Sequence, residues 1–247
     1  MPGSIPLSDR SRVLGTAEFD GVVAVVTRAD DRVRAWLPSD ASREPITGRH
    51  HGGRPVVVLF GEQSNAATHL AGFRIPLGRT YRELAVAVPV GPDEAGPGPA
   101  TALVRMYADY FPVVWNGRVR YGFGKALAEI HRATGSFVVA RPGGGPACVA
   151  VHEPTGPWSA TAPGPALGEI AGWLSGSLVG WTPAGRRVRS ESTWDLTRGR
   201  ARRVRLSLRA FEALLTDFGP GELVDARCEA FEVQGVCWSL GWPERDG

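Results

Sequence analysis

MYADYFPVVWNGRVRYGFGKALA, residues 106–128, is the stretch around which the rest of the chain can be interpreted, because it holds Lys125, the only lysine of the protein. The other 27 of the 28 Lys and Arg residues are arginine. Arginine stays protonated in proteins, whereas a desolvated lysine amine can lose its proton and act as a nucleophile or base. Lys125 is therefore either a residue used for its chemistry or a chance survivor in an arginine-rich composition.

The local sequence predicts surroundings that would favour the free amine of Lys125. Residues 113–121 predict a strand–turn–strand unit around Asn116-Gly117, a hairpin dipeptide, and residues 125–132 predict two helical turns that begin at the lysine. A helix N-terminus, burial and nearby cations all disfavour an ammonium group. Side chains that can line an apolar pocket here are Phe111, Val113, Val114, Trp115, Tyr121 and Phe123, and those that can add positive charge are Arg118 and Arg120.

Outside this stretch, the 32 glycines and 20 prolines favour short strands joined by turns over long helices. The expected strands are 19–28, 56–60, 81–90, 101–107, 136–141, 147–152, 186–194, 202–209 and 224–238, with a weakly alternating stretch at 168–179 and an ambiguous one at 61–73. Short helices are expected at 30–37 and 210–218. We therefore predict a mainly β (α+β) fold, with an antiparallel sheet closed into a barrel or split into a sandwich. Residues 1–17 are expected to form an arm and residues 18–247 a single domain.

Composition and charge narrow the classes of function. The net charge of +3 is too small to require a nucleic-acid or membrane partner. No run approaches the roughly 18 apolar residues of a membrane helix, and the N-terminal sequence has no apolar segment typical of a secretory signal, so we expect a cytoplasmic protein. In the most basic segment, 198–209, apolar residues alternate with arginines, which predicts a strand with one solvated face rather than a nucleic-acid groove.

Several motifs of known chemistry are incomplete. In GFGKA a phosphate loop would require glycine in place of Val119 and Ser or Thr in place of Ala126. Ser64 in GEQSN lacks the final glycine of a nucleophile elbow. His50 and His51 are adjacent and so do not face one site on a helix or strand, and the three cysteines have no metal-binding spacing. We therefore predict no metal and no cofactor.

The stretch at 106–128 resembles the central segment of acetoacetate decarboxylase and its superfamily. The matching residues, without a gap, are Met106, Tyr107, Asp109, Pro112, Gly117, Arg118, Lys125 and Leu127. Upstream, YRELAVAVPV at 81–90 is similar to the family strand that carries the catalytic glutamate in a Tyr-x-Glu context. The segments 25–38 and 202–215 also look like their family counterparts, so the resemblance spans most of the chain, although only the central segment is specific.

The resemblance implies a cone-like antiparallel β-barrel, a homo-oligomer and a Schiff-base lysine inside the barrel. It makes Lys125 the nucleophile and Glu83 the proton shuttle, with Tyr81 donating a hydrogen bond to a substrate oxygen. Arg118 or Arg120 would hold a substrate carboxylate as a fork. The apolar residues expected to contact the substrate are Phe111, Trp115 and Phe123. The expected function is that of a lyase, decarboxylase-like, acting on a small oxo acid or ketone.

Four departures from the family pattern leave other reactions open. The chain has Ala126 where the decarboxylases have a second lysine, Gly124 where they have proline and Phe111 where they have an acidic residue; Phe19 lies near the place of their N-terminal arginine. Superfamily branches that keep the lysine and glutamate carry out aldol condensation, dehydration or cyclisation, and the arginine-rich composition is compatible with bacterial secondary metabolism. A non-catalytic member that binds a small ligand is the other alternative. Without a lysine at 126, burial has to favour the free amine, which predicts a dry pocket around Lys125.

Overall fold

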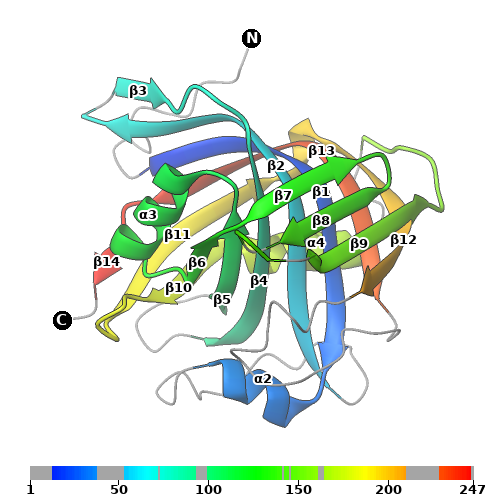
Figure 1. Ribbon diagram of the computed structural model, residues 1–247, viewed down its shortest axis with the longest axis horizontal. Coiled ribbons are helices and arrows are strands. Elements are labelled where there is room, and N and C mark those ends of the chain that lie inside the picture. Colours follow the sequence, from blue (N-terminus) through cyan, green and yellow to red (C-terminus); the bar gives the residue numbers. More distant parts are fainter. Residues whose placement is uncertain are drawn as a thin grey trace.

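Seven strands of the protein close into a barrel. The computed structural model describes residues 13–37, 53–71, 73–92, 99–140, 142–144, 146–160, 164–209 and 228–245. The barrel strands, in order around the ring, are β1 (Val13–Arg28), β2 (Arg54–Leu70), β4 (Tyr81–Pro92), β5 (Pro99–Ala108), β10 (Gly176–Trp181), β11 (Arg187–Asp195) and β13 (Glu229–Gly241), and β13 pairs again with β1 (Figure 1). Neighbouring strands are antiparallel except for the parallel pair β5–β10. The predicted β-barrel is therefore confirmed, with one parallel contact in it.

The sheet continues beyond the barrel and folds over its outside. From β13 it runs through β12 (Arg200–Arg209), β9 (Pro146–Pro154), β8 (Ser136–Ala140) and β7 (Glu129–Ala133). In Figure 1 the strands β7, β8 and β9 pass in front of β1 and β2. Three short strands complete the sheet: β3 (Phe73–Pro76) on β2, β6 (Lys125–Leu127) parallel to β5, and β14 (Glu244–Arg245) on β11.

This double layer explains the continuous apolar runs of β1, β2 and β4. Side chains alternate between the two faces of a strand, and here both faces are buried. In β2, Val56 and Val58 pack into the core between barrel and overlying strands, whereas Val57 and Leu59 pack into the barrel interior. In β4 the same alternation sends the odd-numbered residues inward, so Glu83 is directed to the interior beside Ala85.

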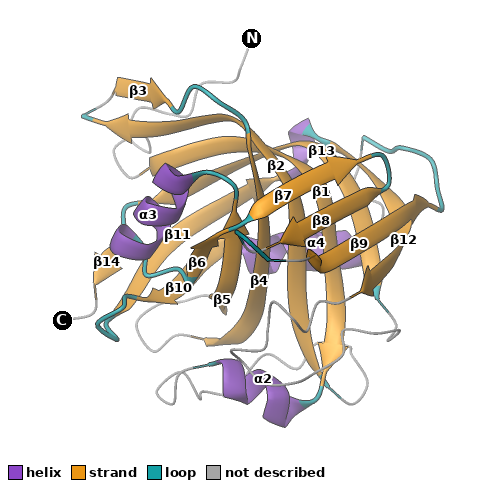
Figure 2. Cartoon of the chain, viewed as in Figure 1, coloured by secondary structure: helices purple, strands orange, loops and turns teal. Residues whose placement is uncertain are grey.

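The helices lie at the periphery and at the ends of the barrel (Figure 2). They are α2 (Asp30–Trp36), α3 (Phe111–Arg120), α4 (Pro165–Leu174) and a short 3-10 turn, η2 (Leu196–Arg198). Helix α4 contributes Leu167, Ile170, Trp173 and Leu174 to the core inside the barrel. None of the described helices is long and apolar enough to cross a membrane.

Two local predictions around Lys125 are wrong: the predicted hairpin is a helix, and the predicted helix is a strand. Residues 111–120 form helix α3 instead of a hairpin: Pro112 lies in the first helical turn, where its fixed φ suits a helix start, and this context overrides the turn tendency of Asn116-Gly117. Residues 125–127 form strand β6 instead of a helix, because they pair with β5 in the register Met106↔Lys125. The helix-dipole argument for Lys125 therefore fails.

Other boundaries differ in smaller ways. The predicted arm is too long, since β1 begins at Val13 and its first residues pair with β13 and β2. The ambiguous stretch at 61–73 is mostly a continuation of β2, and the stretch at 168–179 is divided between α4 and β10. Strand β13 has a bulge at Gly235, whose φ is +68°. The predicted helix at 210–218, His50 and His51 lie outside the described residues.

Candidate active site

A cavity of about 120 Å³ lies inside the barrel, between the β1–β2–β4–β5 wall and strands β11 and β13. Helix α3 closes one side of it, and Leu174 of α4 and Leu178 of β10 reach it from another. Most of its wall is apolar, and the apolar lining residues include Leu14, Phe19, Leu59, Ala85, Leu103, Met106, Val113, Phe123, Leu174, Leu178, Trp194 and Leu240. The few ionisable groups on this wall therefore lie among mostly apolar side chains.

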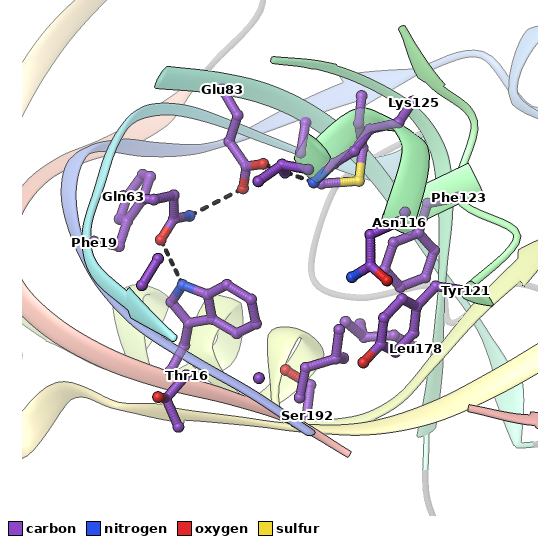
Figure 3. Close-up of a pocket in the computed structure, with 18 of the residues that line it drawn as sticks. Thr16, Phe19, Gln63, Glu83, Asn116, Tyr121, Phe123, Lys125, Leu178 and Ser192 are labelled. Carbon is purple, nitrogen blue, oxygen red and sulfur yellow. Dashed lines mark hydrogen bonds and ion pairs between the residues drawn. The ribbon is translucent and has the colours of Figure 1, made fainter. Parts of the chain in front are cut away.

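Lys125 and Glu83 meet at one side of the cavity (Figure 3). The Lys125 Nζ atom lies 3.1 Å from Glu83 Oε2, and the two side chains are 8% and 9% exposed. Glu83 comes from β4 and Lys125 from β6, and both strands pair with β5, at Ala108 and Met106 respectively. The two residues predicted to be catalytic are thus both buried and in contact with each other.

A chain of hydrogen bonds orients Glu83. Gln63 Nε2 donates to Glu83 Oε1 at 2.9 Å, and Trp238 Nε1 donates to Gln63 Oε1 at 2.5 Å. Indole nitrogen can only donate, so it fixes which end of the Gln63 amide faces the carboxylate. One oxygen of Glu83 is consequently held by Gln63, while the other is directed to Lys125.

The loop before β6 places the lysine. Gly122 has a φ of +65°, and a Cβ there would lie 2.7 Å from the carbonyl carbon of Trp181, so a residue with a side chain would strain the turn. The loop is held by Trp181 N–H donating to Gly122 O at 2.7 Å and Phe123 N–H donating to Gly117 O at 3.0 Å. Tyr121 and Phe123 stack with ring centroids 5.3 Å apart, which gives the loop a rigid apolar side.

Tyr81 lines the cavity near Glu83 and is 4% exposed. Burial raises the pKa of Tyr81 well above its ordinary value of 10.0, and the neighbouring carboxylates of Glu83 and Asp109 act in the same direction. Its hydroxyl therefore stays protonated and can donate a hydrogen bond, as its predicted role requires. Phe123, 5% exposed, also lines the cavity as predicted.

The other four predicted substrate-binding residues do not line the cavity. Phe111 and Trp115 are 62% and 52% exposed, Arg118 is exposed and Arg120 is half-buried. The physical reason is the helical form of α3, in which residues three and four apart share a face. The face towards the cavity carries Val113, Asn116 and Gly117, so Phe111, Trp115 and Arg118 point elsewhere.

Some site residues were not found by sequence reasoning. Gln63 lay in a stretch left ambiguous, although the alternation of Val57 and Leu59 would have directed it inward. Trp238 and Ser192 carried no local signal, because only the closure of the barrel brings β11 and β13 to the cavity. Among the described residues, no group of three or more His, Cys, Asp or Glu side chains could hold a metal ion.

Ala126, which stands where the decarboxylases have their second lysine, lies on the other side of β6 from Lys125. It is half-buried and packs against the core between the barrel and the overlying strands. Successive side chains of a strand point to opposite faces. Residue 125 of β6 therefore faces the cavity, whereas residue 126 faces the core between the barrel and the overlying strands. The cavity side of this site is formed without any contribution from residue 126.

Comparison with solved structures identifies the fold. Acetoacetate decarboxylase from Legionella pneumophila aligns over 100% of this chain and 92% of its own, with a TM-score of 0.63 and 13% identity. The enduracididine biosynthesis enzyme MppR, complexed with the condensation product of pyruvate and imidazole 4-carboxaldehyde, aligns over 99% and 96%, with a TM-score of 0.63 and 17% identity. An acetoacetate decarboxylase-like enzyme from Sphingomonas wittichii aligns over 100% and 99%, with a TM-score of 0.59 and 15% identity.

At these identities the likeness establishes the fold. No family model and no curated protein matches the sequence. The chain has the acetoacetate decarboxylase fold over essentially its whole length.

Proposed function

Starting from the acetoacetate decarboxylase fold, we propose that this protein is a lyase that forms an imine between Lys125 and a small oxo acid or ketone. The observation that carries the proposal is the 3.1 Å contact between Lys125 Nζ and Glu83 Oε2 at the wall of a largely apolar cavity. A desolvated lysine amine can act as a nucleophile once it loses its proton, and the carboxylate in contact with it can accept that proton. The two side chains are only 8% and 9% exposed, which limits the access of bulk solvent to the amine and the carboxylate.

The first step forms the imine. Glu83 accepts a proton from the Lys125 ammonium, and the free amine attacks the carbonyl carbon, so that a C–N bond forms. The carbonyl oxygen takes up two protons and leaves as water, since the ammonium and the carbonyl together give one iminium and one water. In this proposal Glu83 moves these protons, and Tyr81, whose raised pKa keeps it protonated, donates a hydrogen bond to the oxygen.

The second step uses the iminium as an electron sink. The electron pair of a breaking bond next to the iminium carbon flows to nitrogen, giving an enamine. In decarboxylation this bond is C–COO⁻ and carbon dioxide leaves; Glu83, after taking up one proton from solvent, then protonates the carbon to give the iminium of the product. Hydrolysis by one water releases the product and regenerates the Lys125 ammonium.

An aldol-type reaction is the second candidate, and a specific observation favours it. MppR, which has the same fold, was solved with a condensation product of pyruvate and an aldehyde. The same iminium serves this chemistry, because loss of a C–H proton to Glu83 gives the enamine that attacks a second carbonyl. Carbon dioxide release identifies decarboxylation, whereas formation of a carbon–carbon bond to a second carbonyl compound identifies the aldol route.

Borohydride trapping tests the imine. The protein is incubated with a panel of oxo acids and ketones, reduced, and read by intact mass and peptide mapping. We expect an adduct on the peptide that contains Lys125, and none in the Lys125→Arg variant, which keeps the charge but forms no imine. Besides Lys125 only the N-terminal amine can react, and mapping separates the two. If no carbonyl compound modifies Lys125, the enzyme proposal is wrong and a non-catalytic, ligand-binding role replaces it.

A further inference from the structure

One hydroxyl group that lines the cavity has no hydrogen-bond partner in the described part of the chain. Ser192 of β11 is 5% exposed, and its Oγ atom is buried and unpaired. Buried hydroxyls in folded proteins are nearly always hydrogen-bonded, because burial without a partner costs free energy. An unpaired hydroxyl on the wall of a cavity is therefore a candidate for binding a ligand.

Ser192 lies across the cavity from the reacting groups. Figure 3 shows Lys125 and Glu83 at one side and Ser192 at the other, with Asn116 and Tyr121 between them along one edge. The register pairs Ser192 with Leu240, another lining residue, which places both on the interior face. The two ends of the cavity thus differ: one has the ion pair and the other has a neutral hydroxyl.

The groups near Ser192 are uncharged. Tyr121 donates a hydrogen bond from its hydroxyl to Gly241 O at 3.3 Å, and burial raises its pKa above the ordinary value of 10.0, so it stays neutral. Of the described residues that line the cavity, Lys125 is the sole cation, and Glu83 already balances its charge. A carboxylate brought to the Ser192 end would be buried without a charge partner, which is strongly unfavourable.

Apolar side chains separate the two ends. Phe19, Leu59, Leu103 and Leu178 are among those that line the cavity. Its volume of about 120 Å³ is comparable to the engineered apolar cavity of about 150 Å³ that holds a benzene molecule. The space therefore suits a short apolar body with a polar group at each end.

We propose that Ser192 binds an uncharged oxygen, a hydroxyl or a carbonyl, at the remote end of the substrate whose reacting carbonyl lies at Lys125. This inference rests on the proposed function and specifies the substrate class: a small carbonyl compound with a short apolar body and a neutral oxygen at its far end. Ser192 is a binding residue in this scheme and takes no part in proton transfer.

Three ketones of similar length test the proposal by borohydride trapping on Lys125. They are methyl butyl ketone, its analogue with a hydroxyl in place of the terminal methyl, and levulinate, which has a carboxylate at that end. Since an uncharged hydrogen bond changes affinity by about five-fold, the hydroxyl analogue should reach half-maximal trapping at about a five-fold lower concentration than methyl butyl ketone. Levulinate should require a higher concentration than either.

Two alanine variants give the matched comparison. Ser192→Ala should abolish the preference, so that the hydroxyl analogue and methyl butyl ketone reach half-maximal trapping at the same concentration. Its melting temperature should not fall, because the substitution removes an unpaired buried hydroxyl. Ser190→Ala is the control: Ser190 is in the same strand, 2% exposed and equally unpaired, but does not line the cavity, so the preference should persist.

The outcomes separate the two proposals. Equal trapping of the hydroxyl and methyl compounds, or a preference that survives in Ser192→Ala, overturns the role of Ser192 while leaving the lysine imine in place. Preferred trapping of levulinate overturns the uncharged remote group. If neither the three ketones nor the oxo acids of the wider panel modify Lys125, the imine proposal is wrong. The inference about Ser192 then fails with it.

Discussion

The side chain of Lys125 lies directly against the backbone of Gly117, and the contact leaves no space for a side chain at position 117. A Cβ atom built there would lie 2.7 Å from Lys125 Cδ and 3.5 Å from Cε. Helix α3 therefore serves as a wall that directs the lysine stem towards Glu83. This explains the glycine of the matched Gly-Arg pair better than a turn does, since the residue is helical here.

Gly117→Ala should impair the site without impairing the fold. In a helix, alanine is favoured over glycine by about 1 kcal/mol, so propensity alone predicts a more stable protein. The clash instead displaces the flexible lysine, and a displacement of about 1 Å at a reacting atom costs on the order of 100-fold in rate. We expect imine trapping to slow by about that factor. Gly168→Ala in α4, where a Cβ meets nothing within 4 Å, is the control; trapping at the wild-type rate in Gly117→Ala would refute the contact.

Glu83→Gln should slow the proton transfers that accompany formation of the imine and of the enamine. The amide keeps the shape of the carboxylate but cannot accept a proton, and general acid–base catalysis contributes on the order of 100-fold or more. We expect exchange of substrate C–H protons with deuterium, followed by NMR, to slow by at least that amount. Glu62→Gln is the matched control, because Glu62 precedes Gln63 but pairs with Arg82 and Arg132 away from the cavity. Equal exchange in both variants would exclude Glu83 as the shuttle.

Trp238→Phe should weaken catalysis through Gln63. The substitution removes the donor to Gln63 Oε1, so the amide is no longer held in the orientation that presents its nitrogen to Glu83. The loss of one hydrogen bond, about 1 kcal/mol, predicts roughly five-fold slower deuterium exchange. Trp242→Phe changes the same side chain at a site that is 44% exposed and should have no effect. Identical rates in the two variants would show that Trp238 does not orient the amide.

The exposed side of α3 should be dispensable for chemistry. Phe111→Ala and Arg118→Gln alter side chains that point away from the cavity, and surface substitutions usually change stability by less than about 0.5 kcal/mol. We expect wild-type trapping per subunit with every carbonyl that reacts. If Arg118→Gln reduces trapping of oxo acids but not of other carbonyl compounds, Arg118 does hold the substrate carboxylate, as the sequence predicted.

Tyr81 should contribute to unfolding at alkaline pH. Its pKa is raised in the folded protein by burial and by Glu83 and Asp109, so the phenol stays neutral while the unfolded chain ionises near its ordinary value of 10.0. The folded state then binds more protons than the unfolded state, and the free energy of unfolding falls as pH rises above that value. Urea unfolding of Tyr81→Phe across this range should show a shallower fall than wild type; parallel curves would contradict the raised pKa.

The sequence was sufficient for the properties that depend on short-range pattern and residue chemistry. Alternation and β-branched residues predicted most of the strands, and the double burial of β1, β2 and β4 accounts for their unbroken apolar runs. The uniqueness of Lys125, and the resemblance of residues 81–90 to the family strand with its Tyr-x-Glu context, identified the two groups that meet at 3.1 Å. These features could be found because the signal for each lies within a few residues of it.

Only the tertiary structure decided which residues accompany that pair. Local propensity favoured a helix at 125–132 and a hairpin at 113–121, but pairing with β5 made residues 125–127 a strand, and the segment before it became α3. Because residues 111–120 are helical, Gly117 and Asn116 face the cavity. The side chains of Phe111, Trp115 and Arg118 point away from it. Gln63, Ser192 and Trp238 come together through barrel closure, since pairing between strands distant in sequence, rather than local preference, determines which side chains share an interior.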